Sequence, residues 1–125
     1  MKYCILFGLV TLASTQFLGR QRQFNRPASG PAVDANQGGS LYHYSWLHDG
    51  GREYVHSGVV AYCNRLGGGW APVSIESAEE NNFVSGVIAS HRLNWIWTGG
   101  VRAGSGWRWL SGGSFRGINW SHTGG

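Results

Sequence analysis

The chain contains two cysteines, Cys4 and Cys63, and a cysteine can serve as a nucleophile, a metal ligand or one half of a disulfide. A nucleophilic Cys63 would need a histidine base held against it. Helical spacing instead puts Cys63 on one face with Val60 and Leu66, so its side chain points into an apolar interior. We therefore predict a structural disulfide at Cys63 and no catalytic thiol.

Two histidines, His43 and His48, are candidates for a metal-binding pair. They lie five residues apart in a segment that alternates as a strand does. Successive side chains of a strand point to opposite faces, so residues five apart face opposite sides of the sheet. The spacing therefore disfavours a shared metal site, and the sequence predicts no metal ligand.

Adjacent carboxylates, Glu79 and Glu80, could suggest general acid and base chemistry, but both fall at the start of a predicted helix. Capping and the helix dipole account for them there. The glycine-rich segment 99–106 lacks the lysine of a phosphate-binding loop and is not followed by a helix, so we predict a turn. No nucleophile, base and orienting group can be assembled, and the sequence predicts no catalytic residue and no enzyme.

The segment Asn119-Trp-Ser121 is a sequon, which makes Asn119 the candidate for N-glycosylation. The chain also carries seven tryptophans. Such side chains can stack on sugar rings or fill a core, and in so small a domain we expect most of them to be core.

The first 15 residues have the order of a secretory signal peptide. Lys2 precedes an apolar run that ends in the small residues Ala13 and Thr15, with cleavage expected before Gln16. A buried N-terminal helix is the alternative, and it fits poorly because a basic loop follows. The run is too short to span a bilayer, so we predict a secreted, extracellular protein without a membrane anchor. Loss of Cys4 would leave Cys63 with its partner absent from the chain.

Residues 16–40 have the composition of a disordered basic linker or pro-segment, with Arg20, Arg22 and Arg26 among polar and proline residues. A basic arm that touches acidic glycans or membranes is the alternative. Without Lys2, nine basic residues face six acidic ones, a net charge of +3. Because three of the arginines lie in this segment, the globular part is nearly neutral, which argues against nucleic-acid binding.

From residue 41 the pattern predicts an α+β domain. We expect a β-hairpin of residues 41–47 and 52–56, then a helix over 57–66 ended by three glycines. A second helix begins at the capping box of Ser77 and Glu80 and runs to about Ser90. Short strands follow at 94–98 and 107–110.

The order of these motifs resembles the first part of a C-type lectin-like domain over residues 41–125. The segments that carry the resemblance are Ala61-Tyr-Cys-Asn-Arg-Leu-Gly-Gly68, Val73-Ser-Ile-Glu-Ser-Ala-Glu-Glu80, Trp95-Ile-Trp-Thr-Gly-Gly100, and Trp107-Arg-Trp-Leu110 with Asn119-Trp120. The resemblance implies an α+β double-loop fold, incomplete at its C-terminus and truncated before the long loop and C-terminal strands. It also implies that Cys63 pairs with a cysteine near the end of the complete domain.

In such domains calcium and sugar are held by carboxylates and amides of the long loop and a following strand, and those motifs would begin after Gly125. We therefore expect calcium for the complete domain and assign no sugar or metal ligand in this chain. The expected function is calcium-dependent recognition of a carbohydrate or glycoprotein ligand by a secreted lectin. The alternative is a calcium-independent lectin-like module that binds protein, matrix or another surface.

Overall fold

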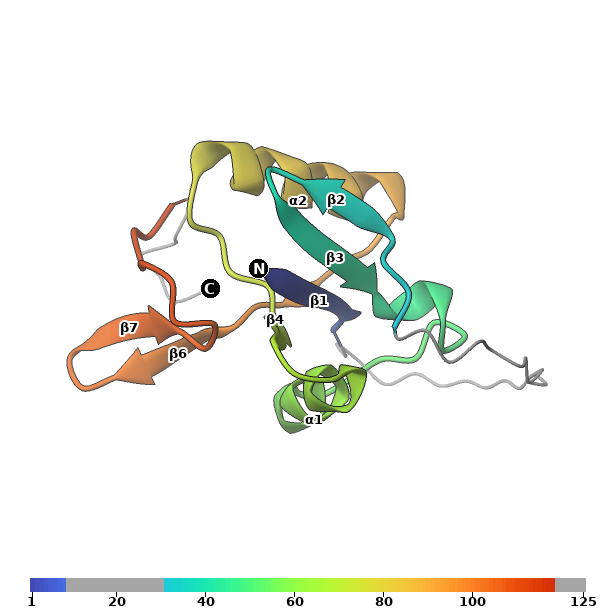
Figure 1. The fold of residues 1–125 in the computed structure, drawn as a ribbon, viewed down its shortest axis with the longest axis horizontal. Helices are drawn as coiled ribbons and strands as arrows, with labels where there is room; N and C mark the ends of the chain where they lie inside the picture. The colour runs from blue at the N-terminus through green and yellow to red at the C-terminus, as the bar shows by residue number, and fades with distance from the viewer. Residues whose placement is uncertain (9–30, 119–125) are drawn as a thin grey trace.

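The structure is a computed structural model that describes residues 1–8 and 31–118. Its main sheet has β1 (Lys2–Phe7) at the centre, between β3 (Ser40–Tyr44) and β4 (Trp70–Pro72), both parallel to it. β2 (Ala35–Gln37) pairs antiparallel with β3 at one edge. β5 (Ile96–Trp97) pairs antiparallel with the end of β1. Figure 1 shows β1 and β3 side by side.

The burial of β1 explains why its sequence is apolar throughout. Tyr3, Cys4, Ile5 and Leu6 are each at most 2% exposed. A central strand of parallel pairs is covered on both faces, so it is a continuous apolar run instead of an alternating one. A signal peptide requires the same kind of run. A chain that lost residues 1–15 would lack the central strand of this fold, and residues 9–15 lie outside the described part.

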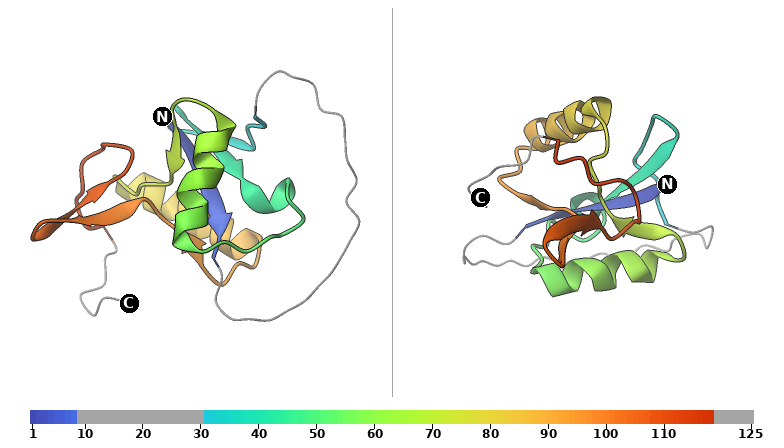
Figure 2. Two further views of the ribbon diagram at one scale, coloured as in Figure 1. Left: turned by 90° about the horizontal axis from the view of Figure 1, so that it is seen from below. Right: turned by 90° about the vertical axis from the view of Figure 1, so that its left-hand side faces the viewer.

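Two helices cover opposite faces of the sheet, as Figure 2 shows in its right-hand view. β1 alternates between them: Tyr3 and Ile5 join the cluster under α2 (Ala78–Ser90), and Cys4 and Leu6 join the cluster under α1 (His56–Leu66). The predicted α+β class is confirmed by this arrangement.

Both helices follow the predicted spans closely. α1 ends at Gly67, whose φ of 121° is one that side-chain-bearing residues rarely adopt. Its buried face contains Val59 and Cys63, with Leu66 packed against them. The buried valine is therefore Val59, and the prediction that Val60 faces inward is wrong. In α2 the predicted cap is present, because the Ser77 hydroxyl accepts the backbone N–H of Glu80 at 3.0 Å.

The predicted hairpin of residues 41–47 and 52–56 is wrong. β3 ends at Tyr44 and the chain turns into a 3₁₀ helix, η1 (Ser45–Leu47), while Tyr54 makes only an isolated bridge to Gly8. Both edges of β3 are already occupied, by β1 and by β2, so no edge is left for residues 52–56.

The predicted linker of residues 16–40 must also be shortened. Residues 35–37 form β2, and a two-residue turn at Gly38 and Gly39, with φ of 59° and 84°, returns the chain into β3. Positive φ at both central residues is the geometry of a tight hairpin turn, which glycine adopts without strain. The domain therefore includes residues before 41; residues 16–30 lie outside the described part.

A second, two-stranded sheet extends from the rest of the molecule (Figure 1). It consists of β6 (Gly100–Ala103) and β7 (Gly106–Trp109), joined by the turn predicted within the glycine-rich segment 99–106. The described helices are too short or too polar to cross a membrane.

Candidate functional site

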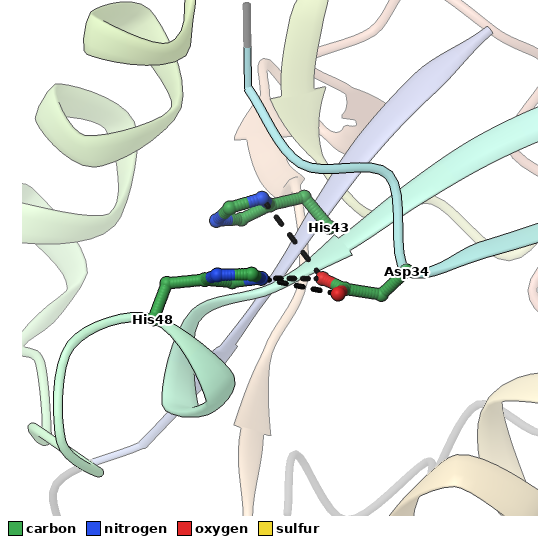
Figure 3. Close-up of side chains that lie close together, drawn as sticks. All are labelled: Asp34, His43 and His48. Atoms are coloured by element: carbon green, nitrogen blue, oxygen red, sulfur yellow. Dashed lines mark hydrogen bonds and ion pairs between the residues drawn. The ribbon is translucent and has the colours of Figure 1, made fainter. Parts of the chain in front are cut away.

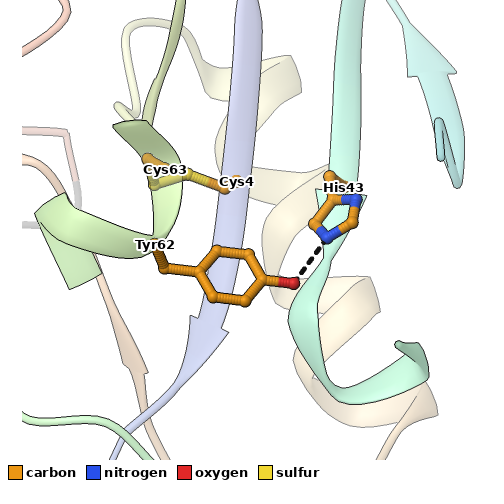
Figure 4. The surroundings of a disulfide bond; sticks show 4 residues. All are labelled: Cys4, His43, Tyr62 and Cys63. Atoms are coloured by element: carbon orange, nitrogen blue, oxygen red, sulfur yellow. Dashed lines mark hydrogen bonds between the residues drawn. A yellow bond between two sulfur atoms is a disulfide. The ribbon is translucent and has the colours of Figure 1, made fainter. Parts of the chain in front are cut away.

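Cys63 forms a disulfide with Cys4, and the two Cα atoms are 6.0 Å apart (Figure 4). Both residues are at most 1% exposed, so Cys63 is structural, as predicted. The prediction that its partner is absent from the chain is wrong for this structure. The alternation of β1 directs Cys4 toward the inner face of α1, a pairing that was missed because Cys4 had been assigned to a signal peptide.

Three side chains that form no contiguous sequence motif lie close together beside β3. They are Asp34, His43 and His48 (Figure 3). The two imidazole rings stack with centroids 4.5 Å apart and an interplanar angle of 19°. This overturns the expectation that they face opposite sides of a strand. The strand rule stops applying at Tyr44, where η1 turns the chain and brings His48 back over His43.

Asp34 is the centre of this cluster. Its carboxylate oxygens lie 2.9 and 3.1 Å from Nε2 of His48, and Oδ2 lies 4.0 Å from Nδ1 of His43. The backbone N–H of Tyr44 donates to Oδ2 at 2.7 Å. The carboxylate is therefore oriented by the strand end while it faces both histidines.

His43 is held by a hydrogen bond at each ring nitrogen. Nδ1 is 2.8 Å from the carbonyl oxygen of Ala32, and Nε2 is 2.7 Å from the hydroxyl of Tyr62 on α1 (Figure 4). Because a carbonyl can only accept, Nδ1 carries the proton in this arrangement and Nε2 accepts from the tyrosine. Burial, which disfavours the imidazolium, lowers the pKa of His43, and the Ala32 carbonyl offsets part of that effect.

Of the two carboxylates at the start of the second helix, Glu80 has a structural role. Glu80 accepts the backbone N–H of Glu76 at 2.9 Å and the hydroxyl of Tyr42 at 2.7 Å. It thus caps α2 and fastens the helix to β3. Burial and this carboxylate together raise the pKa of Tyr42 far above its ordinary value.

An aromatic surface is formed by Arg102 and Trp107 of the β6–β7 hairpin and by Phe115 of the segment that follows it. The Trp107 side chain is 40% exposed, and the guanidinium of Arg102 lies 5.3 Å from its ring centroid. Phe115 stacks on Trp107 with centroids 6.3 Å apart. Trp109, two residues further along β7 and therefore on the same face, is 2% exposed. Its ring lies 4.8 Å from that of Phe115, and its indole N–H donates to the carbonyl of Ser114 at 3.1 Å.

The tryptophans are thus divided between core and surface. Trp70 and Trp109 are buried, Trp46 and Trp97 are half-buried, and Trp95 and Trp107 are exposed. The expectation that most would be core is met only in part by the six described. Asn119, the candidate for glycosylation, lies outside the described residues, as does Trp120.

No family model, no curated protein and no solved structure matches this chain. The resemblance to C-type lectin-like domains stays a prediction.

Proposed function

We propose that this chain is a non-enzymatic, lectin-like recognition module that works outside the cell and binds carbohydrate or glycoprotein. The observation that carries the proposal is the aromatic surface of Arg102, Trp107 and Phe115 at the extended β6–β7 hairpin. The motif series described above, from residue 61 to residue 110, adds independent support from the sequence.

The chemistry of this surface suits a sugar. The exposed part of the Trp107 indole, flanked by Arg102 and Phe115, offers apolar surface against which the C–H side of a pyranose ring can pack. The neighbouring guanidinium adds hydrogen-bond donors and a positive charge that favour hydroxyl or carboxylate groups at the ring edge. Buried Trp109 packs against Phe115 and donates its indole N–H to the carbonyl of Ser114, so the surface is held in place before ligand arrives.

The disulfide supports the extracellular part of the proposal for a chain that keeps residues 1–15, because Cys4 lies in that segment. A buried disulfide that links a helix to a central strand persists in an oxidising compartment and is rare in the cytosol. As a lectin-like module, the chain would bind sugar in a calcium-dependent way.

Binding of the oxidised chain to an immobilised glycan panel tests the proposal, with Trp107→Ala as the site variant. We expect the substitution to weaken binding by at least about fivefold, since one stacked aromatic contributes roughly 1 kcal/mol or more. Trp95→Ala is the matched control, because Trp95 is also exposed, at 59%, and lies outside the hairpin. Equal losses in the two variants, or no binding to any glycan, would contradict the proposal.

A calcium-independent module that binds protein, matrix or another surface is the second candidate. It is favoured by the fact that the hairpin surface offers an aromatic pair and a cation instead of the oxygen ligands that calcium needs. The same panel, extended to matrix proteins and run with and without a chelator, separates the two. Binding to a matrix protein and to no glycan, dependent on Trp107 and unaffected by the chelator, favours the second candidate.

A further inference from the structure

We propose that Asp34, His43 and His48 form a binding site for a transition-metal ion of the zinc type, separate from the hairpin surface and independent of the lectin-like function. In the described part of the chain, these three residues are a group whose ligand atoms all lie within 4.8 Å of one another. Figure 3 shows both imidazoles directing a nitrogen at the same carboxylate.

The ligand set selects the kind of metal. Two imidazole nitrogens and one carboxylate are typical of zinc, and they leave a fourth position open. Calcium prefers six to eight oxygen ligands and would gain little from two nitrogens. The site therefore differs in kind from the calcium site expected for a complete lectin-like domain.

The distances require only small adjustments. Tetrahedral ligands about 2.0–2.2 Å from zinc are roughly 3.3–3.5 Å apart. His48 Nε2 and Asp34 Oδ2 are 2.9 Å apart, and His43 Nδ1 is 4.0 Å from the same oxygen. The first pair must open and the second must close, each by well under 1 Å. The two histidine nitrogens lie within 4.8 Å of each other and must also approach. The imidazole rings, which now stack at an interplanar angle of 19°, must tilt so that both nitrogens point at one ion. The ion would take the place of the proton now shared by His48 and Asp34.

His43 must also change tautomer, because Nδ1 now donates to the carbonyl of Ala32. If the proton moves to Nε2, that nitrogen can donate to the Tyr62 hydroxyl, which accepts as readily as it donates. Ala32 is exposed, so water can replace the lost donor at its carbonyl. Both nitrogens of His43 therefore keep a partner when metal binds.

The surroundings already hold the ligands in place. The Tyr44 N–H orients Asp34, and Tyr62 orients His43, as outer-shell partners do in metal sites. The three candidate ligands differ in exposure. The side chain of His43 is 4% exposed, that of Asp34 14% and that of His48 30%. An ion can reach the site from the His48 side, where the open coordination position also faces solvent.

Titration of the oxidised, untagged full chain with Zn²⁺ against a chromophoric chelator tests the inference, and Co²⁺ serves as the spectroscopic probe. We expect one ion per chain and a visible Co²⁺ absorption band of the intensity that four-coordinate sites give. Keeping the disulfide intact excludes thiolate ligands from Cys4 and Cys63.

His48→Gln is the site variant, because His48 is the most exposed ligand and its loss should leave the fold intact. We expect the affinity for Zn²⁺ to fall at least about tenfold and the Co²⁺ band to disappear. His56→Gln is the control, since His56 lies on α1 outside the cluster. Absence of stoichiometric binding by the parent chain, an unchanged affinity in His48→Gln, or an equal loss in His56→Gln would each overturn the inference.

Discussion

Removing the disulfide between Cys4 and Cys63 is the sharpest test of the role given to β1. The substitution of both cysteines by alanine takes away the cross-link without leaving a free thiol. The bond joins residues 59 positions apart, and the chain-entropy relation for a loop of that length gives about 4 kcal/mol of lost stability. Single domains are commonly stable by about 5–15 kcal/mol, so the double variant should lose roughly a quarter to four fifths of its stability.

Urea unfolding followed by tryptophan fluorescence and circular dichroism measures the effect, with the reduced parent chain as a second route to the same state. We expect a large fall in the midpoint of unfolding and a similar result by both routes. A loss below about 1 kcal/mol would refute the reasoning, because it would mean that the cross-link barely restricts the unfolded chain.

The same argument extends to the N-terminal segment. A chain that begins at Gln16 lacks β1 and its four buried side chains, each worth roughly 1.5–3 kcal/mol on burial, so we expect it not to form this fold. Mass spectrometry of the protein exported from a eukaryotic cell would show whether residues 1–15 are kept. A stable, cooperatively folded chain starting at Gln16 would show that β1 is dispensable.

Three further predictions concern stability. Glu80→Ala removes a helix cap and the partner of a buried tyrosine, so thermal unfolding should show a loss of about 1–3 kcal/mol, and an unchanged melting temperature would contradict this. Gly99→Ala would place a Cβ 2.9 Å from the carbonyl oxygen of Pro72 and should destabilise the fold by about 1–3 kcal/mol. Gly86→Ala adds a methyl group in open space on α2 and should stabilise the fold by up to about 1 kcal/mol. The reverse order of stabilities in urea titrations would refute the packing described. Burial lowers the pKa of His43, so the unfolded chain takes up a proton at this histidine at a higher pH than the folded chain does. The contribution of His43 to stability should therefore be complete above about pH 6.5 and fall as the pH drops below that value. His43→Gln should flatten this pH dependence of stability, and a dependence that persists in the variant would belong to other groups.

Local chemistry made parts of this structure predictable from the sequence. The Ser77 and Glu80 pattern predicted the start of α2, because a cap is satisfied within four residues of chain. Gly67 marked the end of α1 for the same reason. The Gln-Gly-Gly-Ser segment before β3 also carried a two-residue turn signal, which its linker-like surroundings obscured.

The sequence by itself determined the α+β class, the two helices, the turn in segment 99–106 and the inward position of Cys63. Only the tertiary structure decided that Cys4 is its partner, because a buried central strand and a signal peptide are both continuous apolar runs. It also decided that His43 and His48 meet at Asp34, since the period of a strand holds only while the strand continues and η1 interrupts it. Contacts that depend on where a chain turns back require the whole fold, because no local spacing encodes them.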